Sequence, residues 1–201
     1  QWFSWTQIYP FIRGANLAIL KLTENEAGFD SSFTNRLLGE AYFMRGYFYS
    51  QLMRQYGGVV LTLSPFALED EAANPRASFE QTVNQIISDI DQSITLLADA
   101  PVNKSRAHKI TALALKARVL THAASDLYEP SKNSSISTIA GYSNKELVSY
   151  TGGSQAARWQ AAMAASKALL DATTGYKLDY SVPASFEEAK QNYEDIWLQG
   201  D

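Results

Sequence analysis

The sequence predicts an all-α fold of stacked antiparallel helical hairpins, in the style of tetratricopeptide repeats. Apolar residues recur at steps of three and four along five segments, which is the spacing of one buried helix face. Polar stretches with glycine or proline separate these segments, and there is little strand signal. The helix pairs are much longer than a tetratricopeptide unit of about 34 residues. We expect a single helical domain over residues 1–201.

The first two helices are defined by their apolar faces and by a glycine stop. The first is expected from about Trp5 to Leu22, with Pro10 either in its first turn or at a kink. The second carries its apolar face through Tyr56 and should end at Gly57-Gly58, because glycine readily adopts the left-handed conformation after a helix C-terminus. A short extended segment should follow this helix.

The later helices have recognisable boundaries. Ser78 and Gln81 have the spacing of a capping box, so a third helix should start there. The fourth is expected at roughly Lys109 to Leu127, because Pro130 bars its continuation. A fifth should occupy 154–174, and a weaker, acidic helix 185–193.

The segment 129–153 differs from the rest of the chain. It is rich in Ser, Thr, Asn and Gly. A loop of this length without regular structure is uncommon in a compact domain and is usually functional or mobile. We therefore expect an exposed insertion here.

Composition excludes several classes of function. The net charge of −4 and the scattered Lys and Arg residues provide no basic field for nucleic acid. The chain has no cysteine and two histidines, which excludes thiolate chemistry and argues against a His-rich metal centre. No apolar stretch reaches the roughly 20 residues that span a bilayer, and the first residues lack the features of a signal peptide.

No catalytic, metal or cofactor site is predicted. His122 and Asp126 would share a helix face at a spacing of four, but no third ligand lies nearby in the sequence, so a structural role is favoured. Asp89 and Asp91 point in different directions on a helix and do not form an acid–base pair. Glycine-rich nucleotide loops and calcium loops are absent from the sequence.

The candidate ligand-binding residues are aromatic, because aromatic rings can stack on the apolar faces of sugars. One group lies at the start of the first helix, where the alternative is that the rings pack against a part of the protein that is missing from this chain. A second group lies in or beside the segment 129–153, where tyrosines can also serve as anchors. The six candidates are Trp2, Trp5, Tyr9, Tyr128, Tyr142 and Tyr150.

Four ordered blocks of the sequence resemble the SusD/RagB family. The most specific, residues 37–63, is similar to the pattern E-A-x-F-x-R-A-x-x-Y-x-x-L-x-x-x-Y-G-x-V-P-L, with Val60 in place of the usual proline. The others are residues 76–98, including Arg76, Ser78, Ile86 and Asp89; residues 105–125, including Lys109, Ala117 and Arg118; and residues 158–179.

The resemblance implies a non-catalytic protein of the bacterial outer-membrane surface that binds oligosaccharide or polysaccharide and delivers it to a SusC-like TonB-dependent transporter. It also implies that this chain is part of a longer lipoprotein, attached to the membrane only through a lipid anchor outside residues 1–201. The alternative is a helical scaffold that docks to a transporter or peptide without direct sugar binding. No cofactor is implied.

Overall fold

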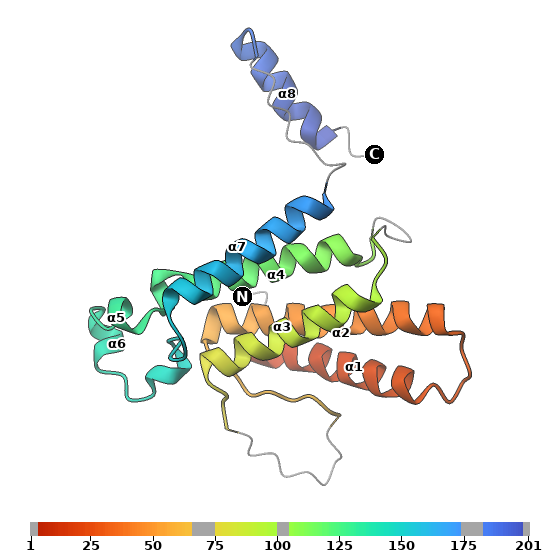
Figure 1. The fold of residues 1–201 in the computed structure, drawn as a ribbon, viewed down its shortest axis with the longest axis horizontal. Helices are drawn as coiled ribbons and strands as arrows, with labels where there is room; N and C mark the ends of the chain where they lie inside the picture. Colours follow the sequence, from red (N-terminus) through yellow and green to blue (C-terminus); the bar gives the residue numbers. More distant parts are fainter. Residues whose placement is uncertain (1–3, 66–74, 100–104, 174–182, 199–201) are drawn as a thin grey trace.

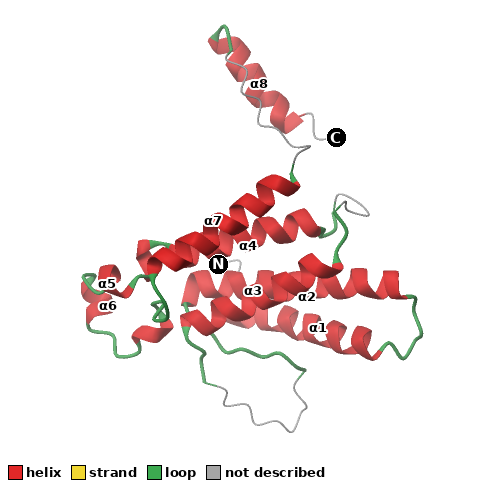
Figure 2. Cartoon of the chain, viewed as in Figure 1, coloured by secondary structure: helices red, strands yellow, loops and turns green. Residues whose placement is uncertain are grey.

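The computed structural model describes residues 4–65, 75–99, 105–173 and 183–198, and all regular structure within these ranges is helical (Figure 2). This confirms the all-α prediction. The long helices are α1 (Trp5–Glu24), α2 (Ser31–Tyr56), α3 (Phe79–Leu96), α4 (Lys109–Ala124), α7 (Gln155–Ala172) and α8 (Phe186–Leu198). Two single-turn α-helices and two 3₁₀ turns lie between α4 and α7, namely η1 (Asp126–Tyr128), α5 (Pro130–Asn133), α6 (Ser137–Ala140) and η2 (Lys145–Leu147).

The helices pack in a sequential stack. α2 lies between α1 and α3, α3 also contacts α4, and α4 packs along α7 (Figure 1). The short elements α5 and α6 gather at one end of the α4–α7 pair (Figure 1). Neighbours in the sequence are thus neighbours in space, as expected for helical hairpins.

Local capping explains several helix boundaries. At the start of α3 the Ser78 hydroxyl accepts a hydrogen bond from the backbone N–H of Gln81. The Gln81 side-chain oxygen accepts one from the backbone N–H of Ser78, which confirms the predicted capping box. α2 ends at Gly57, whose φ of 73° lies in the region that favours glycine. The predicted glycine stop is therefore confirmed.

The structure excludes the first turn as the place of Pro10, one of the two predicted alternatives, and ends the fourth helix earlier than predicted. Pro10 lies in the second turn of α1, where its missing N–H leaves the carbonyl of Thr6, an exposed residue, for solvent. α4 ends at Ala124, and a separate 3₁₀ turn holds Asp126. His122 and Asp126 consequently do not share a helix face.

Gly57 also allows a close approach between distant segments. The Gly58 N–H donates to the carbonyl oxygen of Leu147 at 2.7 Å, and a Cβ on Gly57 would lie 2.1 Å from that same oxygen. We expect Gly57→Ala to lower the free energy of unfolding by more than about 1 kcal/mol, since it combines a left-handed φ with a clash. Chemical denaturation would measure this loss.

Gly14 provides the matched control for that substitution. It lies within α1, and a Cβ there meets no atom within 4 Å. Gly14→Ala should raise the free energy of unfolding by about 0.5–1 kcal/mol, because alanine is the better helix former. If both substitutions destabilised equally, the special role of Gly57 would be refuted.

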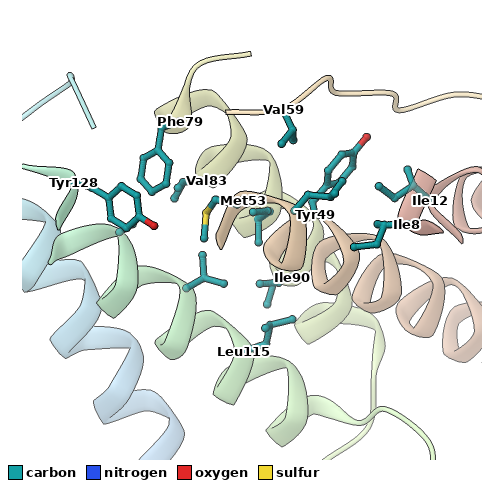
Figure 3. Packing of buried hydrophobic residues seen from close by; sticks show 14 of the residues in the cluster. Ile8, Ile12, Tyr49, Met53, Val59, Phe79, Val83, Ile90, Leu115 and Tyr128 are labelled. Carbon is teal, nitrogen blue, oxygen red and sulfur yellow. The ribbon is translucent and has the colours of Figure 1, made fainter. Parts of the chain in front are cut away.

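A single buried cluster joins α1, α2, α3 and α4. Met53 of α2 lies near its centre, with Ile8 of α1, Ile90 of α3 and Leu115 of α4 around it (Figure 3). At one end of the cluster the rings of Phe79 and Tyr128 stack with centroids 4.0 Å apart (Figure 3). The apolar stripes predicted from the sequence therefore face one another.

A buried polar network crosses the same helices. The Arg45 guanidinium donates to both carboxylate oxygens of Asp89, at 2.8 and 2.6 Å, and to the Asn16 side-chain oxygen at 2.9 Å. Asn16 in turn donates to the carbonyl of Thr62 at 2.8 Å. The network links α1, α2 and α3 to the extended segment that follows α2.

The segment 129–153 is more ordered than predicted. Asn133 and Ser149 are buried and bonded to each other, with the Asn133 amide donating to the Ser149 hydroxyl at 2.8 Å. Leu147 is also buried, against the glycine stop of α2. The prediction of an exposed insertion holds for the α6 region, which contains no buried residue, and is wrong for the two ends of the segment.

Candidate carbohydrate-binding site

Tyr150 is positioned by the core. Its backbone N–H donates to the carbonyl of Tyr128 at 2.8 Å, and its ring meets Phe79 edge-on with centroids 6.2 Å apart. Because Phe79 and Tyr128 are buried, these contacts fix the backbone and one edge of Tyr150 while its side chain stays partly exposed. A preorganised aromatic group of this kind is suited to ligand binding.

An arginine from α7 lies over the Tyr150 ring. The guanidinium carbon of Arg158 is 4.7 Å from the ring centroid, which is a cation–π distance. Arg158 also pairs with Glu129 and donates to the carbonyl of Gly152 at 3.1 Å. Its Nε is buried without a partner in the described part of the chain. The arginine is thus held in place with its buried Nε–H donor unused.

Glu80 of α3 is the third polar side chain at this site, beside Tyr150 and Arg158. Its carboxylate lies against Gly152, since a Cβ on that glycine would be 2.2 Å from a Glu80 carboxylate oxygen. Burial raises the pKa of the Tyr150 hydroxyl, and the Glu80 carboxylate raises it further, so the phenol stays protonated at neutral pH.

These side chains line a cavity of about 260 Å³ between α3, α4 and α7. Tyr150, Glu80 and Arg158 supply its aromatic and charged groups, and Ala157 and Leu120 part of its apolar wall. A carboxylate accepts, a guanidinium donates, and a phenol does both. This mixture of polar groups with apolar surface suits a polyol such as a sugar.

The aromatic group at the start of α1 is brought together by packing. Trp5 and Tyr9 have ring centroids 4.9 Å apart, and Tyr56 meets Trp5 edge-on at 5.5 Å. The Tyr9 hydroxyl donates to the carbonyl of Val60 at 2.7 Å, so this polar group already has a partner within the chain. Trp2 lies outside the described residues. The rings of Trp5 and Tyr9 pack on the core of this chain, a place that neither of the two sequence alternatives named.

The two remaining tyrosines have different surroundings. Tyr128 is only 7% exposed, and its hydroxyl pairs with His122 Nε2 at 2.8 Å, so it supports the site from within the core. Tyr142 is 38% exposed and follows α6, away from the Tyr150 cavity. Of the five sequence candidates that the structure describes, Tyr150 is therefore the one that lines this cavity.

Comparison with known proteins connects this site to a family. Residues 2–120 match the family SusD-like_3, described as "Starch-binding associating with outer membrane". This match covers more than half of the chain. The chain belongs to the SusD-like family. The matched residues include the core helices and Glu80 and end before Tyr150 and Arg158.

Relatives support the assignment. The chain is 32% identical over 141 residues to "SusD-like protein P38" of Formosa agariphila, covering 70% of this chain and 26% of the relative. The solved structure named BT4246 is 25% identical, with a TM-score of 0.72, over 92% of this chain and 32% of that one. A "Laminarin binding SusD-like protein" is 24% identical, with a TM-score of 0.56, over 61% and 26%. The chain thus spans about a quarter to a third of the length of these relatives.

The SusD-like family consists of non-catalytic binding proteins. Where the structure is described, no group of three or more His, Asp or Glu residues is placed to hold a metal ion. His122 instead forms a hydrogen bond within the core, and Asp126 pairs with Lys132 at 2.6 Å. Each of these two residues thus has a partner within the chain.

The family name indicates an association with the outer membrane. Within the described ranges, no helix combines the length and apolar character needed to cross a bilayer. The residues of the family blocks have structural roles in the fold, since Arg45 and Asp89 form the buried pair and Ser78 caps α3.

Proposed function

We propose that this SusD-like protein binds an oligosaccharide at the bacterial surface and passes it to a SusC-like TonB-dependent transporter, without chemical conversion. The cavity beside Tyr150 carries the proposal, because it combines a fixed aromatic ring with a carboxylate and a guanidinium. The family description and the laminarin-binding relative support a glycan as the ligand. Attachment to the membrane would come from a lipid anchor outside this chain.

Substitution of Tyr150 tests the ligand site. Tyr150→Ala in the full-length gene product should weaken binding of a neutral glycan by about tenfold, which corresponds to about 1.4 kcal/mol, since it removes both the ring and the hydroxyl. Affinity electrophoresis in gels containing laminarin or starch would measure the change.

Tyr142→Ala is the matched control, because Tyr142 is exposed near the same segment and does not line the cavity. It should leave glycan retardation unchanged. A larger loss with Tyr142→Ala than with Tyr150→Ala would move the site to the α6 region. Failure of the unmodified protein to bind any glycan in a broad panel would refute the proposal.

A second candidate function is a docking scaffold that does not itself hold sugar. An almost wholly apolar groove of about 450 Å³ runs between α1 and α2, lined by Phe11, Leu37 and Met44 among others. Phe11 is 58% exposed and Met44 40% exposed, which is unusual for large apolar side chains of a monomer when they cluster. Co-purification with a transporter that is abolished by Phe11→Ser, without any glycan binding, would favour this function.

A further inference from the structure

A separate pocket lies between α2 and α4, lined by other α4 residues than those at the Tyr150 cavity. It has a volume of about 230 Å³, and its cationic and polar lining residues are Arg54, Gln51 and Ser50 from α2 with Arg118 and His122 from α4. Met53, Leu115 and Val119 form its apolar floor. We refer to this feature as the Arg54–Arg118 pocket.

No carboxylate lines the Arg54–Arg118 pocket. Across the described residues, no Asp or Glu lies within ion-pair distance of Arg54 or Arg118. Other arginines of the same helices are neutralised locally, since Arg45 pairs with Asp89 and Arg36 with Glu40. Two arginines therefore line one pocket, and neither has a described counter-charge.

The position of Arg54 has a partial explanation in its helix. It lies in the last turn of α2, where a positive charge is stabilised by the helix dipole. Arg118 has no such explanation, because it lies within α4, six residues before the helix ends at Ala124. Its placement opposite Arg54 is what makes the pocket positive.

His122 adds an imidazole to this pocket, and its pKa depends on the charges nearby. Burial lowers the pKa of its imidazole, and the Arg54 charge lowers it further, so the ring is neutral at pH 7. Its Nε2 pairs with the Tyr128 hydroxyl, and Nδ1 has no hydrogen bond to a described residue. A negative charge in the pocket would oppose the effect of Arg54 and stabilise the protonated ring.

We propose that the Arg54–Arg118 pocket binds an oxyanion, namely the carboxylate or sulfate group of an acidic sugar. Guanidinium groups match both anions through paired N–H donors. The apolar floor suits the C–H face of the sugar ring that carries the anion. That the anion belongs to a sugar rests on the proposed glycan-binding function; the oxyanion site itself does not.

The test uses three small probes at constant ionic strength with the full-length gene product: sodium sulfate, glucuronate and neutral glucose. Glucuronate, sulfate or both should bind in calorimetry, while glucose should not. Binding of sulfate alone favours a sulfated sugar over a uronic acid, binding of glucuronate alone favours a uronic acid, and either result supports the oxyanion site. Failure of both anions to bind overturns it.

Arginine substitutions locate the binding. Arg54→Gln and Arg118→Gln should each weaken anion binding by about tenfold or more, since each removes a charged hydrogen-bond donor to the oxyanion. Both side chains are exposed, so the variants should keep the melting temperature of the unmodified protein. Arg13→Gln is the matched control, because Arg13 is an exposed arginine of α1 that lines a different pocket. Equal losses in all three variants would reveal general charge attraction and refute the site.

Histidine resonances provide an independent readout. The His122 signal, assigned by its loss in His122→Gln, should move on anion binding and report a raised pKa. His108 lies at the start of α4, bonded to Thr111, and should not respond. Because the bound anion favours the protonated ring, affinity should fall as pH rises through the pKa of His122 in the complex. An unchanged His122 titration in the presence of bound anion would contradict the proposed location.

The two proposals can fail separately. Tyr150→Ala should not change sulfate or glucuronate binding, and Arg118→Gln should not change retardation by a neutral glycan. Anion binding without any neutral-glycan binding would leave the Arg54–Arg118 pocket supported and the Tyr150 site refuted.

Discussion

Asp89→Asn should lower the free energy of unfolding by about 3–5 kcal/mol, because it leaves the buried Arg45 charge without its counter-ion. The side chains of Arg45 and Asp89 are only 7% and 2% exposed. The carboxylate accepts three hydrogen bonds, two from Arg45 and one from Gln85 at 3.0 Å. Urea denaturation followed by circular dichroism would measure the loss.

Asp91→Asn is the matched control on the same helix. Asp91 pairs with Lys116 at 2.6 Å, but its side chain is 49% exposed. A surface ion pair contributes about 0–1 kcal/mol, so this variant should remain close to the unmodified protein. A loss of similar size for the two variants would show that burial of the Arg45–Asp89 pair is not the cause.

Removing both charges should cost less than removing one. In the double variant Arg45→Met, Asp89→Leu no buried charge is left unpaired, and a buried ion pair often contributes little relative to apolar groups of similar size. The Asn16 oxygen and the Leu63 carbonyl would still lose their bonds to Arg45. We therefore expect the double variant to lie between Asp89→Asn and the unmodified protein.

The Arg45–Asp89 pair illustrates what the sequence could and could not predict. Both residues stand in blocks that resemble the SusD/RagB family, and the helices that carry them were predicted. Their pairing was not, because the residues are 44 positions apart and periodicity describes one helix at a time. In the sequence Asp89 could be compared only with nearby Asp91, and that comparison does not reveal Arg45 as its partner.

Helix boundaries could also be predicted only where residues close in the sequence determine them. Ser78 and Gly57 act through neighbours within a few residues, so their capping roles were visible in the sequence. The end of α4 was predicted three residues late, because a 3₁₀ turn continues with residues that are compatible with a helix. Boundaries marked by a capping side chain or a glycine were therefore predictable, whereas the helix end that continues into a 3₁₀ turn was not.

The candidate site depended on contacts that no local pattern contains. Tyr150 was selected as a loop tyrosine, but its partners Glu80 and Arg158 come from α3 and α7. Tyr128 was selected by the same criterion and is instead buried, because Phe79 lies against its ring. Gly152 could have indicated the site from the sequence, since a glycine near an aromatic residue can mark a place where another part of the chain, here Glu80, approaches closely.

Phe79 connects the stability of the fold to the candidate site. It is fully buried as the first residue of α3, stacked on Tyr128 at 4.0 Å and edge-on to Tyr150 at 6.2 Å. Phe79→Ala should lower the free energy of unfolding by about 3–5 kcal/mol, as expected for a large ring removed from a packed core. Thermal and urea denaturation would measure this loss, and Phe186→Ala, at an 81% exposed position on α8, should change it by less than about 0.5 kcal/mol.

The milder variant Phe79→Leu separates packing from positioning. Leucine retains much of the apolar volume, so the protein should remain folded, but it cannot stack on Tyr128 or meet the Tyr150 ring edge-on. Because Tyr150 is also bonded to the Tyr128 carbonyl, loss of the stack should loosen both residues. We expect folded Phe79→Leu to bind neutral glycan more weakly than the unmodified protein, in the same assay as Tyr150→Ala. Unchanged glycan affinity in this variant would mean that Tyr150 does not depend on the core for its position, and that the cavity is held by Arg158 and Glu129 alone.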